Sequence, residues 1–175
     1  TTGVVNGNVI VIAGRDATLV VDTGQIPSVA RRMVAEIREM KAPPVRYILH
    51  THWHGDHTEG NFFFGKDATI IAHANVRKRL LDPPVIFGQK TPPYASFALP
   101  IVTYTESMSL YVNGEEIKMV YYPNGHTDGD SVVFFVNSNV VHLGDDFFTG
   151  KFPFVDLDER PDVLSMLVAA TLALA

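Results

Sequence analysis

The sequence contains no cysteine among its 175 residues. Disulfide bridges and thiolate metal ligands are therefore both excluded, and any metal ion would have to be held by imidazole nitrogen and carboxylate oxygen. Long apolar runs are missing as well. The longest candidate, residues 163–175, falls short of the roughly 18 residues of a membrane-spanning helix and carries Ser165 and Thr171. We therefore expect no membrane segment.

Positive charge is also scarce, with 14 lysines and arginines against 19 acidic residues and a net charge of −5. Nucleic-acid-binding proteins gather basic side chains, so we expect a small-molecule substrate and no nucleic acid. The length and the 46% apolar content predict one globular domain over residues 1–175. The first residues show no leader pattern, and the last nine, "LVAATLALA", stop inside an apolar helical pattern. We therefore expect the domain to be incomplete at its C-terminus, and composition leaves compartment and oligomeric state open.

Short β-branched and apolar runs alternate with two clear helical patterns. One helix begins at Pro27, places Val29, Met33, Ile37 and Met40 at helical spacing, and ends before the prolines at 43–44. A shorter helix is predicted over 77–81 and a final one from about residue 161, while 82–100 contains five prolines and is predicted as a long loop. The predicted strands are 4–13, 18–22, 45–49, 69–73, 101–105, 108–112, 116–122, 131–137 and 139–143. Mixed sheets covered by helices, in a layered α/β fold, follow from this order.

Four of the seven histidines and one aspartate lie within "ILHTHWHGDH", residues 48–57, directly after a strand. In extended backbone the side chains of His52 and His54 project to the same side. Gly55 then allows a sharp turn, so that Asp56 and His57 can face a neighbouring point. Zn²⁺ binds imidazole nitrogen and carboxylate oxygen, and catalytic sites use three protein ligands with one open position. The cluster therefore predicts two ligands for each of two adjacent metals.

Two metals need further ligands from elsewhere in the chain. His126 lies in the glycine-rich turn "PNGHTDGD" between two strands and is the predicted third ligand of the first metal. Asp145 follows a strand and a glycine in "VVHLGDD", and its two oxygens could bridge two cations; Asp146 is the alternative bridging residue. Two metals with a shared carboxylate are the resulting expectation.

The remaining histidines are interpreted as supporting or core residues. His50 lies closest to the strand and is predicted to support the ligands from behind or to be merely structural. His73 and His142 lie within or at the end of strands and are expected in the core or behind the ligands. Trp53 suits either a pocket wall or the core.

Four motifs, "LVVDTG", "THWHGDH", "GHTDGD" and "VVHLGDDFF", occur in the order typical of one family. The chain resembles the metallo-β-lactamase superfamily, whose signature is HxHxDH, over nearly its whole length. The resemblance implies a four-layer αβ/βα sandwich with the metals at one edge, between the two sheets. It also implies a hydrolase of the thioesterase, lactonase or general type, since the lactamase branch that uses cysteine is excluded.

The resemblance also implies a role for each matching residue. His52, His54 and His126 would hold one metal, Asp56 and His57 the other, and Asp145 would bridge them. Asp22, in "DTG", would support the ligands from behind. The family's second metal normally takes one more histidine, and none follows His142 here. The second site is therefore short of one ligand unless a further C-terminal portion supplies it.

These residues predict hydrolysis by a metal-bound hydroxide, because a divalent metal acidifies its bound water to a pKa of about 7. Asp56 is expected to orient the hydroxide or pass a proton, and the cations, zinc rather than iron, to stabilise the oxyanion. A small ester, thioester, lactone or β-lactam-like ring is the expected substrate, and the pocket residues are unknown. Loop 82–100, with Phe87, Tyr94 and Phe97, is either an apolar pocket wall or plain surface packing. The alternatives are a non-hydrolytic iron oxidoreductase with the same ligands and a metal-binding module without turnover.

Overall fold

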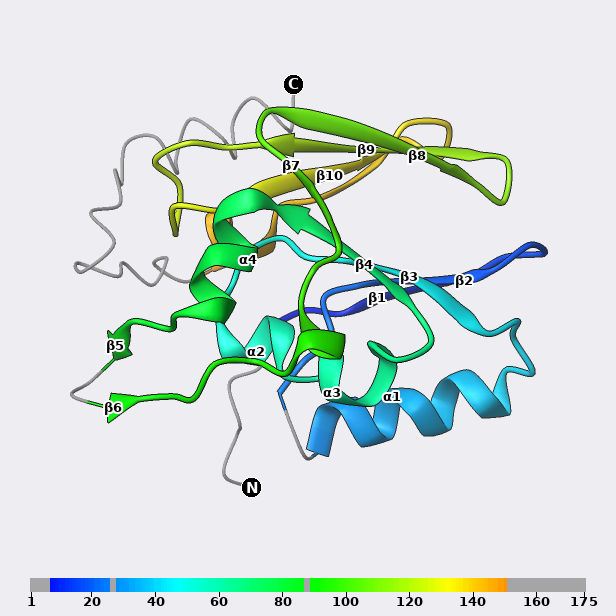
Figure 1. Ribbon diagram of the computed structural model, residues 1–175. Helices are drawn as coiled ribbons and strands as arrows, with labels where there is room; N and C mark the ends of the chain where they lie inside the picture. The colour runs from blue at the N-terminus through cyan, green and yellow to red at the C-terminus, as the bar shows by residue number, and fades with distance from the viewer. Residues whose placement is uncertain (1–6, 26–27, 87–88, 151–175) are drawn as a thin grey trace.

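The computed structural model describes residues 7–25, 28–86 and 89–150, which form two packed β-sheets with helices on the outer face of the first (Figure 1). The first sheet has the strand order β1-β2-β3-β4-β7. Strands β1 and β2 pair antiparallel, whereas β2, β3, β4 and β7 run parallel to one another. Their bounds are Ile10–Ala13, Thr18–Val21, Val45–Leu49, Thr69–His73 and Val102–Tyr104.

The second sheet is antiparallel throughout, with the order β11-β10-β9-β8. Its strands span Ser107–Val112 (β8), Glu115–Tyr121 (β9), Ser131–Phe135 (β10) and Val140–His142 (β11). The turn between β8 and β9 is Asn113-Gly114, and both residues have positive φ angles, 56° and 76°. This is the turn chemistry that a tight hairpin requires.

Alternation along the parallel strands divides the core between the two faces of the first sheet. Leu19, Leu49 and Ile71 point toward the second sheet and pack with Met119 and Val133. The neighbouring positions point the other way, toward the helices: Val20, Ile48 and Ile70 pack against Met33, Ile37 and Phe64. The central strands are thus buried on both faces, as expected of a parallel sheet.

The helices are α1 (Ser28–Glu39), α2 (Gly55–Thr58), α3 (Asn61–Phe64) and α4 (Ala74–Leu81). Helices α1 and α3 cover the outer face through the cluster just described (Figure 1). Helix α4 packs Val76 and Leu80 against Trp53 and Ala72 in a third cluster, so Trp53 belongs to the core. No helix within the described ranges has the length and apolar character needed to cross a bilayer.

The predicted strands are confirmed in type: 45–49 and 69–73 match at both ends, and the ends of all others but one differ by at most two residues. The exception is the first, which begins only at Ile10 because its partner β2 has four residues to pair with. Residues 4–6 and the final predicted helix lie outside the described residues.

Three local predictions were wrong. Segment 82–100 is not without structure: it contains β5 (Val85–Ile86), β6 (Gln89–Lys90) and a 3₁₀ turn, η1 (Ser96–Ala98). Helix α1 ends before Met40, which is 57% exposed and takes no part in the core. Helix α4 begins three residues earlier than predicted, because the side chain of His73 accepts the Asn75 N–H and caps it.

Candidate metal centre

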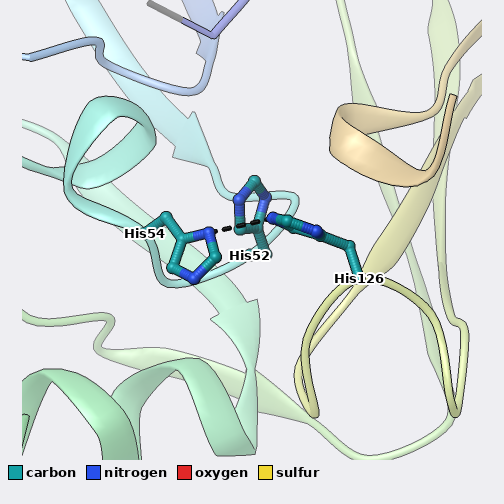
Figure 2. Close-up of side chains that lie close together, drawn as sticks. All are labelled: His52, His54 and His126. Atoms are coloured by element: carbon teal, nitrogen blue, oxygen red, sulfur yellow. Dashed lines mark hydrogen bonds between the residues drawn. The ribbon is translucent and has the colours of Figure 1, made fainter. Parts of the chain in front are cut away.

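The histidine-rich segment follows β3, and the carboxyl ends of the parallel strands β2, β3 and β4 meet at one edge of the first sheet. The second sheet brings two loops to the same edge, the β9–β10 connection with His126 and the segment after β11, where a 3₁₀ turn, η2 (Gly144–Asp146), carries Asp145. Residues far apart in the chain therefore converge on one point between the two sheets (Figure 2).

One group of possible metal ligands contains His52, His54 and His126, whose ligand atoms lie within 4.8 Å of one another. Nε2 of His126 lies 3.0 Å from Nδ1 of His54, and the His52 ring stands edge-on to both (Figure 2). His52 and His126 are buried. This is the trio that the sequence predicted for the first metal.

A second group contains His52, His57 and Asp145, again with ligand atoms within 4.8 Å. Nε2 of His57 lies 3.3 Å from Oδ1 of Asp145, and Oδ2 of the same carboxylate lies 3.8 Å from Nε2 of His126. The Asp145 carboxylate therefore lies between the two groups. Oδ2 of Asp56 lies 3.7 Å from Nε2 of His57, at the margin of the second group but not within it.

The chemistry of these donors fits metal ions. Nε2 of His52 is buried and has no hydrogen-bond partner among the described residues, whereas Nε2 of the buried His57 faces the Asp145 carboxylate at 3.3 Å. A buried polar nitrogen without a partner costs free energy, which a cation at this point would recover. Four imidazoles and one carboxylate, without sulfur, suit zinc and also suit iron.

Asp22 anchors both groups from behind. Its Oδ2 accepts hydrogen bonds from Nδ1 of His57 and from Oγ1 of Thr51, each 2.8 Å long, and its Oδ1 accepts the Thr51 N–H at 2.9 Å. Thr51 Oγ1 in turn lies 3.0 Å from Nδ1 of His52. These contacts leave Nε2 of each ring to face the ligand groups, the arrangement that usually orients metal-binding histidines.

The backbone of Asp22 is left-handed, with φ 59°. Few residue types other than glycine adopt this region, aspartate and asparagine among them. Burial by itself raises the pKa of the Asp22 carboxyl, but the charge of His57 and the hydrogen bonds with His50 and His57 outweigh it and hold the pKa well below its usual range. Asp22 is therefore a permanent buried anion.

His50 lies behind the ligand groups and belongs to neither. Its Nδ1 is 3.3 Å from Oδ1 of Asp22, and its Nε2 is 2.8 Å from Oδ1 of Asn61. Asn61 also accepts a hydrogen bond from Thr23 and donates one to the Ala98 carbonyl. Thr51 and Asn61 are supporting residues that sequence reasoning missed, since an ordinary threonine and asparagine carry no signal in one sequence.

Asp146, the alternative to Asp145, has a different partner. Its Oδ1 accepts the backbone N–H of His126 at 3.0 Å, and it lies in neither ligand group. Nearby, Asp130 accepts hydrogen bonds from the N–H and the hydroxyl of Thr127. Burial, together with the charge of Asp145, raises the pKa of Asp146 to about 7. Asp146 therefore holds the β9–β10 loop in place.

The histidines of the two groups differ in their pKa values, with His52 and His54 on one side and His57 on the other. Burial, then the neighbouring imidazoles, lowers the pKa of His52 well below its usual value and that of His54 to about 3. Burial also opposes the charged form of His57, but the charge of Asp22 and the hydrogen bond with Asp145 outweigh it and raise the pKa of His57 well above the usual value. Without metal, His52 and His54 are therefore neutral, and His57 is a cation.

The other singled-out residues lie away from both groups. His73 stacks on Tyr121 with ring centres 3.9 Å apart, and Nδ1 of His142 accepts the Gly144 N–H. The hydroxyl of Tyr94 lies 2.9 Å from Oγ1 of Thr58 in α2, so segment 82–100 does contact the helix of the cluster. Tyr94 and Phe97 flank the Phe62 ring, and Phe87 lies outside the described residues.

Two curated proteins resemble the chain in sequence. It is 28% identical over 144 residues to the 2,4-dinitroanisole O-demethylase subunit alpha of Nocardioides sp. (strain JS1661), covering 81% of this chain and 41% of that protein. It is 35% identical over 49 residues to a linear primary-alkylsulfatase of Pseudomonas sp. (strain ATCC 19151), covering 28% of this chain and 9% of that protein. The chain thus spans less than half the length of the curated relatives it matches.

Solved structures share the fold. A metallo-beta-lactamase family protein of Thermus thermophilus superposes with a TM-score of 0.74 at 20% identity, over 95% of this chain and 64% of that one. A metallo-beta-lactamase from Pontibacter korlensis gives 0.72 at 16% identity, over 93% and 70%. TTHA1623 in a di-iron-bound form gives 0.70 at 19%, over 98% and 83%. These likenesses confirm the predicted fold class.

The family model of the metallo-beta-lactamase superfamily matches residues 2–174, which is nearly the whole chain. The motifs that carried the resemblance are those that meet at the sheet edge, where the histidine groups can hold metal. The chain therefore belongs to the metallo-beta-lactamase superfamily.

Proposed function

We propose that the chain is a metal-dependent hydrolase that cleaves a small ester, thioester, lactone or β-lactam-like substrate. The observation that carries the proposal is the position of Asp145. Its two oxygens lie 3.3 Å from His57 and 3.8 Å from His126, so one carboxylate reaches both ligand groups, which also share His52. Two adjacent cations are the natural occupants of such a pair of groups.

We assign His52, His54 and His126 to one cation and Asp56 and His57 to the other, with Asp145 between them and zinc as the expected ion. His52 and His54 are neutral and ready to bind, whereas His57 must release a proton first. Asp22 keeps the other proton of His57 on Nδ1, so that Nε2 becomes the ligand atom. The bound cations would supply acidification of a water and stabilisation of an oxyanion.

Asp56 is the residue we assign to proton transfer. Its side chain is more exposed than that of Asp145 or His57, and its Oδ2 lies 3.7 Å from the ligand nitrogen of His57. A carboxylate that is close to the ligands and open to solvent can accept a proton from an attacking water and return it to a leaving group.

A non-hydrolytic iron protein with the same ligands is the second candidate. It is supported by the di-iron-bound form of TTHA1623, whose fold this chain shares. A third possibility is a metal-binding module without turnover. The relative named as an O-demethylase of 2,4-dinitroanisole adds aryl ether cleavage to the reactions that are worth testing.

Metal analysis followed by reconstitution tests the proposal. The purified chain is stripped with a chelator, reloaded with zinc or with iron, and assayed on aryl esters, thioesters, lactones, β-lactams and aryl methyl ethers. We expect zinc-restored hydrolysis that the chelator abolishes. Oxygen consumption by the iron form without hydrolysis would overturn the hydrolase, and one tightly held ion without turnover would favour the binding module.

A pair of matched variants links the result to the site. His54→Ala removes one ligand and should lower zinc content, hydrolysis and the stabilisation that zinc confers. His73→Ala removes an imidazole that lies in neither group and should leave zinc content unchanged. Equal zinc content in both variants would contradict the ligand assignment.

A further inference from the structure

A cleft of about 670 Å³ lies beside the proposed metal centre. One wall is the segment that leads into β1, residues 7–10, and the other is β11 with the turn that follows it, residues 141–149. Asp56 and Asp145 also line the cleft. Since both carboxylates belong to the proposed centre, the cleft is the space through which a substrate would reach it.

The described lining of the cleft contains no lysine or arginine. Its acidic groups are Asp56 and Asp145, whose carboxylates would bind the cations. His142 also lines the cleft, and its Nδ1 is used to accept the Gly144 N–H. An anionic substrate group held against these walls, away from the cations, would lose hydration and find no cationic side chain among the described lining residues.

Apolar side chains make up much of the lining: Val9, Ile10, Val141, Leu143, Phe147 and Phe148. Phe147 is 42% exposed, although it lies only two residues after Asp145. A large apolar side chain left partly in water next to a polar site gains free energy when a ligand covers it.

We propose that this cleft binds a neutral, apolar acyl or aryl group of the substrate, so that the preferred substrates carry no anionic group at the far end of that acyl or aryl group. The inference rests on the proposed function in one respect, namely that the reacting bond lies at Asp56 and Asp145. It narrows the substrate class to esters and thioesters with a neutral acyl or aryl group, and it places substrates with a carboxylate, sulfate or phosphate at the far end of that group at a disadvantage.

A chain-length series on the zinc-loaded protein is the first test. The substrates are p-nitrophenyl acetate, butyrate and hexanoate, with mono-p-nitrophenyl succinate as the anionic counterpart of the butyrate. Each buried methylene should raise kcat/KM by about fourfold. The anionic ester should be about tenfold or more slower than the butyrate, because its carboxylate is desolvated without a partner. Equal or faster hydrolysis of the succinate would overturn the proposal.

Binding of alkyl hydroxamates gives a readout that does not need turnover. Acetohydroxamate and hexanohydroxamate carry the same metal-binding group and differ only in the neutral alkyl chain, so calorimetric titration of the zinc-loaded protein isolates the contribution of that chain. The ratio of the hexanohydroxamate affinity to the acetohydroxamate affinity should be about tenfold smaller in Phe147→Ala than in wild type. Phe63→Ala is the matched control, since Phe63 is 41% exposed on α3 and does not line the cleft.

A second substitution protects the test against a folding defect. Phe147→Lys places a cation in the cleft and should improve the succinate ester relative to the butyrate ester. Hydroxamate binding that depends on chain length, without turnover of any ester, would refute the hydrolase but keep the cleft assignment. Zinc-dependent hydrolysis without a chain-length gain in either assay would refute the cleft assignment but keep the hydrolase.

Discussion

Replacing Asp22 by Asn tests whether the buried anion sets the ligand atom of His57. Asparagine tolerates the left-handed backbone found at this position, φ 59°, so the substitution adds little strain. The Thr51 N–H requires an acceptor at Oδ1, so the amide nitrogen must replace Oδ2. That nitrogen is a donor, and Nδ1 of His57 can meet it only by giving up its own proton. The proton then moves to Nε2, the nitrogen that faces Asp145.

The expected loss in metal affinity is 10- to 100-fold, the usual effect of removing a group that orients a ligand, which corresponds to about 1.4–2.7 kcal/mol. The cation beside His57 should lose more than the one beside His54 and His126, because Asp22 bonds the His57 ring directly, at 2.8 Å. The metal-free protein should also lose about 3 kcal/mol or more, because the buried ion pair between protonated His57 and Asp22 of the wild type is lost.

Stepwise zinc affinities, measured by competition with a chelating indicator, provide the assay. The control is Asp16→Asn, which removes an exposed carboxylate beside Arg15. The pKa of Asp22 is depressed, so its stabilisation is complete above the ordinary carboxyl pKa and is lost as the pH falls. The stability difference between wild type and Asp22→Asn should therefore narrow below about pH 4. Two zinc affinities within twofold of wild type would refute the reasoning.

Three further predictions concern the frame of the site. Gly144→Ala should lower the free energy of unfolding, measured by urea denaturation, by about 1–3 kcal/mol and should weaken zinc binding. The reason is that φ is +56° and the new Cβ would lie 2.8 Å from the Thr51 side chain. An unchanged free energy of unfolding would contradict this prediction. Burial raises the pKa of Asp146 to about 7, so the metal-free wild type should lose stability as the pH rises from about 4 to 7. Asp146→Asn should therefore be more stable than wild type at pH 8, by up to about 4 kcal/mol. Equal melting temperatures of the two proteins at pH 8 would be inconsistent with this prediction. Leu19→Ala should cost about 2–5 kcal/mol without changing zinc content, since Leu19 is fully buried between the sheets; a loss below 1 kcal/mol would be unexpected.

Much of the fold could be predicted because its signals are local. Short β-branched and apolar runs predicted β2, β3 and β4 as strands. Segment 82–100 was missed because its prolines and short apolar pairs carry no periodicity, and pairs as short as β5 and β6 fall below what a pattern can reveal.

The candidate site was only partly accessible to the same reasoning. The spacing of His52, His54, Asp56 and His57 singled them out, since their relation is set by a few residues of backbone. It did not predict that Gly55–Thr58 forms a helical turn, with the result that His57, rather than Asp56, reaches Asp145 within the second group. Asp145 lies within the second ligand group and Asp146 lies in neither, and the contact between Asp146 and the His126 backbone had no sequence signal.

The sequence by itself determined the ligand chemistry, nitrogen and oxygen without sulfur, and the local order of strands, turns and histidines. Only the tertiary structure decided that His126, 72 residues beyond His54, comes within 3.0 Å of it and that Asp22 reaches His57 across 35 residues. The reason is physical: side-chain spacing within one segment follows from backbone geometry, whereas contacts between segments exist only once the two sheets have packed and closed the loops between them.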